Sequence, residues 1–169
     1  MKLKVKEIAL FSVLGTILFI SKIVMEALPN VHLFAMLIVV FTLVFRAKAL
    51  VPIYIYVFLN GLYAGFAPWW VPYLYIWAVL WAAIMLIPKK TPLKLKVLIS
   101  VGISFLHGLL FGVLYAPFQA LMYGLNFKAT IAWVIAGLPF DLTHGISNLI
   151  CGSLILPIVM AFKKVINNH

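Results

Sequence analysis

The segment VHLFAMLIVVFTLVFRAKALVPIYIYVFLNGLYAGF, residues 31–66, joins two apolar runs through a short connection that carries Arg46 and Lys48. Apolar runs of this kind are typical of helices that cross a lipid bilayer. Cationic connections stay on the cytoplasmic side during membrane insertion. We therefore predict one membrane helix from Val31 to Phe45 and a second from Ala49 to Phe66, joined on the cytoplasmic side.

The same alternation extends to both ends of the chain. Eleven of the thirteen basic residues fall in four patches: Lys2, Lys4 and Lys6; Arg46 and Lys48; Lys89, Lys90, Lys94 and Lys96; Lys163 and Lys164. Every second connection between apolar runs is basic, and the connections between them carry almost no positive charge. This alternation predicts six crossings with both termini inside.

The predicted fold is all-α, a compact bundle of six transmembrane helices that forms one domain over residues 1–169. We expect the fifth helix to end before Pro117 and the sixth to be kinked at Pro139 and Pro157. The six expected ranges are Ile8–Leu28, Val31–Phe45, Ala49–Phe66, Tyr73–Ile87, Leu95–Ala116 and Thr130–Phe162.

The composition excludes several classes of protein. Of the 169 residues, 66% are hydrophobic and 9% are charged, whereas a soluble domain carries roughly 25% charged residues. The basic residues behind the net charge of +10 lie beside apolar segments. Their retention on the inner side of the membrane and their attraction to anionic lipid explain the charge better than nucleic-acid binding does. The chain has one cysteine, Cys151, and it has no nucleophile with a base, paired-carboxylate, HExxH or phosphate-loop motif. We predict a protein of the cell membrane that is not an enzyme and has no cofactor and no metal site.

Polar side chains at membrane depth are expensive, so each one needs a partner or a function. Asp141, His144 and Asn148 are spaced i, i+3 and i+7 and share one helical face. Asn60 and Tyr63 on the third helix can converge on the same place. The sequence leaves two roles open for this face: a structural network between helices, or a substrate site in the outer half of the membrane.

Two further positions allow the same alternatives. Lys22 and Glu26 are spaced i, i+4 near the outer end of the first helix, so they can pair with each other or serve a charged substrate group. His107 lies in the middle of the fifth helix. It can bond a neighbouring helix or contact a substrate.

Aromatic residues gather at the outer ends of the helices. The outer ends of the third and fourth helices carry Trp69, Trp70, Tyr73, Tyr75 and Trp77, and the other outer connection carries Tyr123 and Trp133. Such rings form either a belt at the headgroup boundary or a lid over a flat organic ligand, whose ring they would stack on.

Two motifs carry a resemblance to a known family. The turn Leu28-Pro29-Asn30 and the stretch GLPFDLTHGISN, residues 137–148, together with six short helices, resemble the substrate-binding S components of energy-coupling factor transporters. The resemblance implies a subunit that captures a vitamin or related molecule near the outer face. It also implies docking onto a module of one transmembrane scaffold subunit and two ATPases, with toppling in the membrane to release the cargo inside.

The resemblance also implies a docking face of small residues on the first helix. Ala9, Ser12, Gly15 and Thr16 are the residues available here, with Ser12 and Thr16 at the i, i+4 spacing. Small side chains allow the close approach of a partner helix.

The cargo is expected to be organic, because the histidine-rich N-terminal segment of the nickel and cobalt branch is absent. His107 and Tyr115 match a spacing of the thiamin-binding branch. The sequence does not distinguish between a pyridine, a pyrimidine, a flavin ring and part of a corrinoid as the cargo.

Two other classes of function compete with this one. A self-sufficient secondary transporter or channel would show repeated halves with broken helices in matching positions, and the two halves of this chain do not match. A membrane-embedded enzyme or assembly factor would need a catalytic motif near the inner side.

Overall fold

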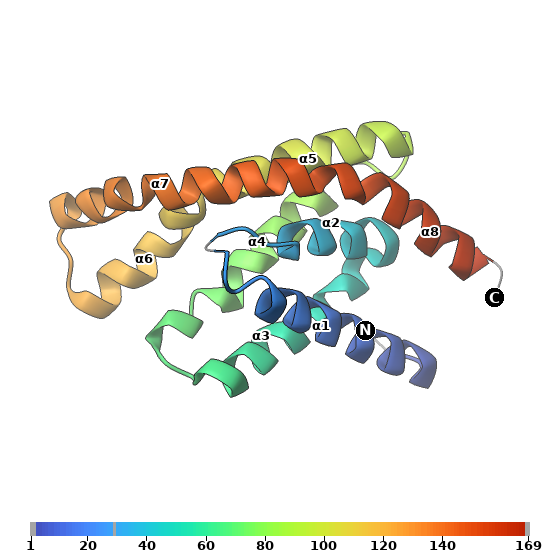
Figure 1. The fold of residues 1–169 in the computed structure, drawn as a ribbon, viewed down its shortest axis with the longest axis horizontal. Coiled ribbons are helices and arrows are strands. Elements are labelled where there is room, and N and C mark those ends of the chain that lie inside the picture. Colours follow the sequence, from blue (N-terminus) through green and yellow to red (C-terminus); the bar gives the residue numbers. More distant parts are fainter. Residues whose placement is uncertain (1–2, 29, 168–169) are drawn as a thin grey trace.

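The computed structural model describes residues 3–28 and 30–167, so Lys2 of the first basic patch and Pro29 of the tight turn lie outside the described residues. Every regular element in the described part is a helix, which confirms the predicted all-α class (Figure 1). In chain order these are α1 (Val5–Val24), α2 (Phe34–Phe45), η1 (Arg46–Ala49), α3 (Leu50–Ala64), η2 (Pro68–Trp70), α4 (Tyr73–Met85), α5 (Leu93–Leu109), α6 (Phe111–Tyr123), α7 (Phe127–Cys151), η3 (Gly152–Leu154) and α8 (Ile155–Asn167).

Within residues 3–28 and 30–167, five helical segments are long and apolar enough to cross a membrane, which supports a multi-pass membrane protein. One of them, Phe34–Ala64, contains two of the six predicted helices. Arg46 breaks it with a φ of 54°, and α3 then runs back along the molecule (Figure 1). Because α2 alone has 12 residues, it is only about 18 Å long, shorter than a hydrocarbon core of ~30 Å. The sixth crossing therefore stays a prediction.

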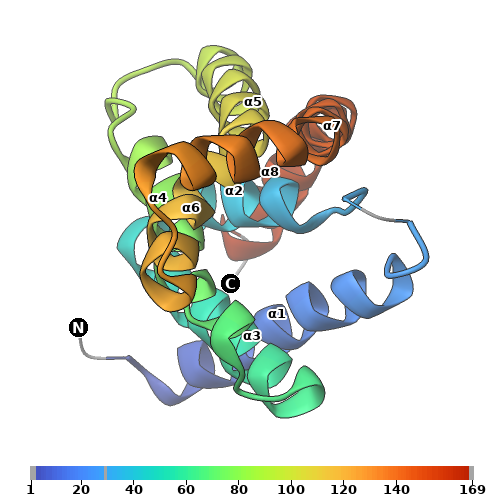
Figure 2. The ribbon, with the colours of Figure 1, turned by 90° about the vertical axis from the view of Figure 1, so that its left-hand side faces the viewer.

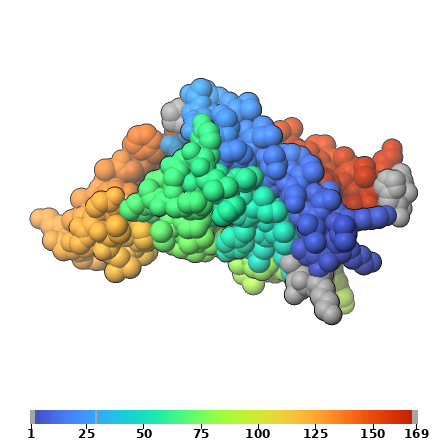
Figure 3. Space-filling model, turned by 90° about the horizontal axis from the view of Figure 1, so that it is seen from below, coloured from blue at the N-terminus to red at the C-terminus, as the bar shows by residue number. Residues whose placement is uncertain are grey.

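Helix α2 lies at the centre of the structure. Viewed along the long axis, α1 and α3 lie on one side of it and α5 and α7 on the other (Figure 2). Seen from below, α1 and α3 lie side by side across the middle of that face (Figure 3). Every residue from Phe34 to Thr42 is buried, which explains why this helix is apolar on all sides.

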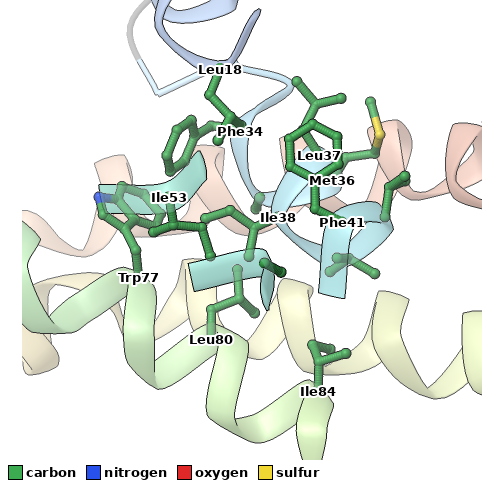
Figure 4. Close-up of a cluster of buried hydrophobic side chains, with 14 of the residues drawn as sticks. Leu18, Phe34, Met36, Leu37, Ile38, Phe41, Ile53, Trp77, Leu80 and Ile84 are labelled. Atoms are coloured by element: carbon green, nitrogen blue, oxygen red, sulfur yellow. The ribbon is translucent and has the colours of Figure 1, made fainter. Parts of the chain in front are cut away.

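The core forms around α2 and connects the two outer pairs of helices. Figure 4 shows Phe34 and Ile38 of α2 beside Ile53 of α3 and Trp77 and Leu80 of α4. All five side chains are buried. The packing fixes the start of α2 against α4, where the cavity described below is found.

The predicted end of the fifth helix is wrong. The helix breaks at Leu110 and continues as α6 through Pro117 to Tyr123. The cause of the break is a side chain of α7: the carboxylate of Asp141 accepts the backbone amide of Gly112, at 3.1 Å from each oxygen. Gly124, with a φ of 63°, ends α6 in the left-handed conformation that favours glycine.

The predicted sixth helix is interrupted close to Pro157, one of its two predicted kink positions. α7 continues as an α-helix through Pro139, and the break comes at the short 3₁₀ segment Gly152–Leu154. Pro157 explains it, because proline has no amide hydrogen to donate to the carbonyl of Ser153 four residues earlier.

The described residues of the basic patches lie at one end of the molecule. Lys48 forms an ion pair with Glu7 near the start of α1, and Arg46 donates to the carbonyl of Met85 at 3.1 Å. Lys96 lies close enough to Lys163 and Arg46 for the like charges to repel. In Figure 1 the starts of α1 and α5 and the whole of α8 lie toward the right, and the opposite ends of α1 and α5 lie to the left.

Candidate functional site

A cavity of about 140 Å³ is lined by residues of six helices and of the connection between α1 and α2, and none of the described residues of the four basic patches contributes to it. Seven of its nine lining residues carry an aromatic or imidazole ring. The lining is Lys22 of α1, Asn30 and His32 of the α1–α2 connection, Phe34 of α2, Tyr56 of α3, Tyr73 and Trp77 of α4, Phe111 of α6 and His144 of α7.

Two histidines meet at this cavity from distant parts of the chain. The rings of His32 and His144 have centroids 4.6 Å apart and planes at 77°. The backbone amide of His32 donates to Ser147 Oγ at 3.1 Å, which ties the α1–α2 connection to α7. His32 Nδ1 and His144 Nε2 are buried and have no hydrogen-bond partner. A buried polar atom that lacks a partner costs about 1–3 kcal/mol, so these two nitrogens suit a guest that would bond them.

Aromatic rings form the remaining walls. The Phe34 ring lies 4.0 Å from Tyr56 and 4.5 Å from Trp77 between centroids, and the Phe111 ring lies 4.9 Å from His144. Trp77 Nε1 is also buried without a partner. Because an indole nitrogen can only donate, Trp77 adds a donor to the two imidazoles of the lining.

The cavity has one ionic group on its lining. Lys22 Nζ bonds Glu26 Oε1 at 2.7 Å and lies 5.5 Å from the centre of the Tyr63 ring. The chain has three acidic residues, Glu7, Glu26 and Asp141, and none of them lines this cavity. Burial lowers the pKa of His32 to about 4, so this ring is neutral at pH 7. The cavity is therefore positive at its Lys22 side and uncharged elsewhere.

No protein family, curated protein or solved structure matches this chain. The residues of the site carry the functional argument by themselves.

Asp141 lies outside the cavity and holds the start of α6. Its two oxygens accept the Gly112 amide, where the helix N-terminus presents partial positive charge. A Cβ on Gly112 would lie 2.6 Å from Asp141 Oδ2, so any side chain there would push the carboxylate out of its present position. Asp141 thereby sets the direction of α6, whose first residue, Phe111, forms a cavity wall.

Asn148 and His107 are buried away from the cavity as well. Asn148 Nδ2 donates to the carbonyl of Ser104 at 2.8 Å and so connects α7 to α5. His107 Nε2 lies 3.1 Å from the carbonyl of Ile76, and its ring packs against Trp77 at 5.8 Å. Asn148 thus links two helices through a hydrogen bond, and the His107 ring packs against Trp77, which lines the cavity.

The other predicted site residues lie outside the lining of the cavity. Trp70 Nε1 donates to the Val57 carbonyl, and the Trp69 carbonyl accepts from Tyr115. None of the following lines the cavity: Glu26, Asn60, Tyr63, Trp69, Trp70 and Trp133, the last of which stacks on Tyr115. Of the twelve residues predicted to bind substrate, the structure brings Lys22, Tyr73 and His144 to one place.

Five residues of the lining are not among those predicted from the sequence: His32, Phe34, Tyr56, Phe111 and Asn30. Trp77 is predicted only as part of the outer aromatic cluster. A lone histidine in a connection has no periodicity that would indicate which way it faces. One signal was available, because His32 directly precedes an apolar run that α2 buries on all sides.

The predicted docking residues divide between two faces of α1. Ala9, Ser12 and Thr16 are exposed, and the hydroxyls of the last two donate to backbone carbonyls one turn earlier. Gly15 is buried against α3, where a Cβ would lie 2.5 Å from Ile55. Gly15 therefore permits the close packing of α1 on α3 and lies off the exposed face.

Proposed function

We propose that this chain is the substrate-binding S component of an energy-coupling factor importer, which captures a vitamin-like small organic molecule. The observation that carries the proposal is the cavity between helices of a multi-pass membrane protein. It is lined by rings and holds three buried nitrogens without partners, on His32, Trp77 and His144. A guest that bonds these nitrogens would remove their desolvation penalty.

The charge distribution supports an orientation. If the basic end faces the cytoplasm, the chain crosses the prokaryotic cell membrane six times with both termini inside. The cavity then lies toward the outer face, where an uptake protein meets its substrate. In that orientation Arg46, where φ is positive, would lie at the inner reversal between the second and third crossings.

The exposed face of α1 supports a docking role. Ser12 and Thr16 lie one turn apart, and their hydroxyls are already bonded to their own helix. A partner helix can therefore approach closely without leaving a polar group unpaired. The chain has no nucleotide-binding motif, so in this proposal ATP hydrolysis by the two ATPases of the module drives uptake.

The test is a binding and transport assay on the purified chain. Titrating a panel of B-group vitamins and their precursors without ATP should change the fluorescence of Trp77, and a Trp77→Phe variant identifies that signal. Uptake into liposomes should require the energising module and ATP. Uptake by the chain alone, driven by an ion gradient, would make it a secondary transporter, and a panel without any binder would overturn the substrate-binding function.

A further inference from the structure

We infer that the guest is a single-ring, planar heteroaromatic carboxylate, and that Glu26 competes with it for Lys22. The inference rests on the proposed function and names the class of substrate for the same cavity.

The volume of the cavity limits the size of the guest. Sites for drug-sized ligands usually enclose about 300–1,000 Å³, whereas this one encloses about 140 Å³. That space accommodates one six-membered ring with a small substituent. A fused three-ring flavin or a corrinoid exceeds it.

The walls set the shape and the polar pattern. Five aromatic side chains and two imidazoles surround the space, and ring–ring contacts favour a flat, unsaturated guest. The Trp77 indole nitrogen is buried without a partner and can only donate, so it favours a guest with an acceptor on its ring edge. His32 Nδ1 and His144 Nε2 can each donate or accept, according to the tautomer, and can therefore bond a second heteroatom.

The distribution of charge sets the sign of the substituent. A cationic guest would need a carboxylate on the cavity wall. Glu7 is paired with Lys48 at the basic end, Asp141 is bonded to Gly112, and Glu26 lies beside Lys22 off the lining. The lining instead offers the Lys22 ammonium, which attracts an anion.

Glu26 regulates how available that ammonium is. Its side chain is 51% exposed and that of Lys22 is 28% exposed, with the two linked at i, i+4. Exposed pairs of this kind are weak, so a carboxylate held by the cavity walls can displace Glu26. Glu26 thus lowers the affinity for anions without touching the ring of the guest.

The experiment uses matched probes and matched variants. Calorimetric titrations would compare pyridine and pyrimidine carboxylates with the corresponding carboxamides, on wild-type protein and on Lys22→Gln, Lys22→Arg and Glu26→Gln. We expect at least one carboxylate to bind about tenfold tighter than its carboxamide, a loss of that preference in Lys22→Gln and its retention in Lys22→Arg. Glu26→Gln should raise the carboxylate affinity by about two- to fivefold and leave the carboxamide unchanged. Thermal unfolding of each variant shows that the comparison is made on folded protein.

Carboxamides that bind as tightly as carboxylates, or a preference that survives in Lys22→Gln, would overturn the inference. If no probe of this panel binds while a larger or cationic molecule co-purifies with the protein, the inference fails and the proposed function stands. If no probe or vitamin binds and nothing co-purifies, both fail.

Discussion

The imidazole rings of His32 and His144 lie 4.6 Å apart between centroids, and each keeps one buried nitrogen free beside the same cavity. His32 belongs to the connection between α1 and α2, and His144 lies in the middle of α7. The bond from the His32 amide to Ser147, one turn beyond His144, fixes this arrangement. The cavity therefore depends on a contact that closes a loop of more than one hundred residues.

His144→Ala should lower the affinity for the guest by about ten- to hundredfold, because it removes one polar contact inside the cavity. The control is Asn148→Ala, which alters a buried polar side chain of the same helix that does not line the cavity. It should lower the temperature of unfolding and change the affinity by less than about threefold. Equal loss of affinity in both variants would show that His144 acts through folding alone.

Acidification should destabilise the folded protein through His32. Burial lowers the pKa of this ring to about 4, against 6.5 when exposed. Between these values the unfolded chain binds a proton at His32 and the folded chain does not. His32 therefore makes its full contribution to the free energy of unfolding above pH 6.5. That free energy declines as the pH falls toward 4, by at most about 1.4 kcal/mol per pH unit for this group. Unfolding temperatures measured from pH 7.5 to 4.5 should show a smaller decline in His32→Asn, and an identical decline would contradict the assignment.

Gly112→Ala should destabilise the protein by about 1–3 kcal/mol, because its Cβ would lie 2.6 Å from Asp141 Oδ2. Gly102 of α5 is the matched control, since a Cβ there meets nothing within 4 Å. Gly102→Ala should be neutral or stabilise by up to about 1 kcal/mol through helix propensity. Thermal unfolding in detergent measures both, and equal effects would argue against the Asp141 contact.

Ser12→Leu and Thr16→Leu should leave guest binding intact and abolish uptake, because a bulky side chain on the exposed face of α1 prevents close helix approach. Ala136→Leu places the same side chain on an exposed position of α7 and should allow uptake. Uptake assays with the complete module, paired with binding assays on the isolated chain, test this. Loss of binding in the α1 variants would show that this face supports the fold instead.

Composition was enough to predict the helical class and the membrane environment, because apolar length and charge placement are local properties of the sequence. The i, i+3, i+7 spacing of Asp141, His144 and Asn148 also indicated that their shared face is buried, which the structure confirms. It could not assign roles within that face. Asp141 bonds Gly112 of α6, His144 lines the cavity and Asn148 bonds Ser104 of α5. Each of these roles depends on residues of other elements.

The break at Leu110 shows the same limit. Pro117 is the stronger local signal, yet the helix ends earlier because a carboxylate 29 residues away bonds the Gly112 amide. His32 was missed for a related reason, since its orientation follows from Ser147 at a separation of 115 residues. Contacts of this range are properties of the folded chain.

The central claim is that the cavity beside His32 and His144 holds a small organic molecule. Native mass spectrometry of the protein released directly from membranes tests it most directly, with His144→Ala as the comparison. The account predicts a bound, ring-containing molecule on the wild-type chain that is reduced or lost in the variant. Wild-type protein that carries no such mass, and that acquires none when offered the vitamin panel, would contradict it.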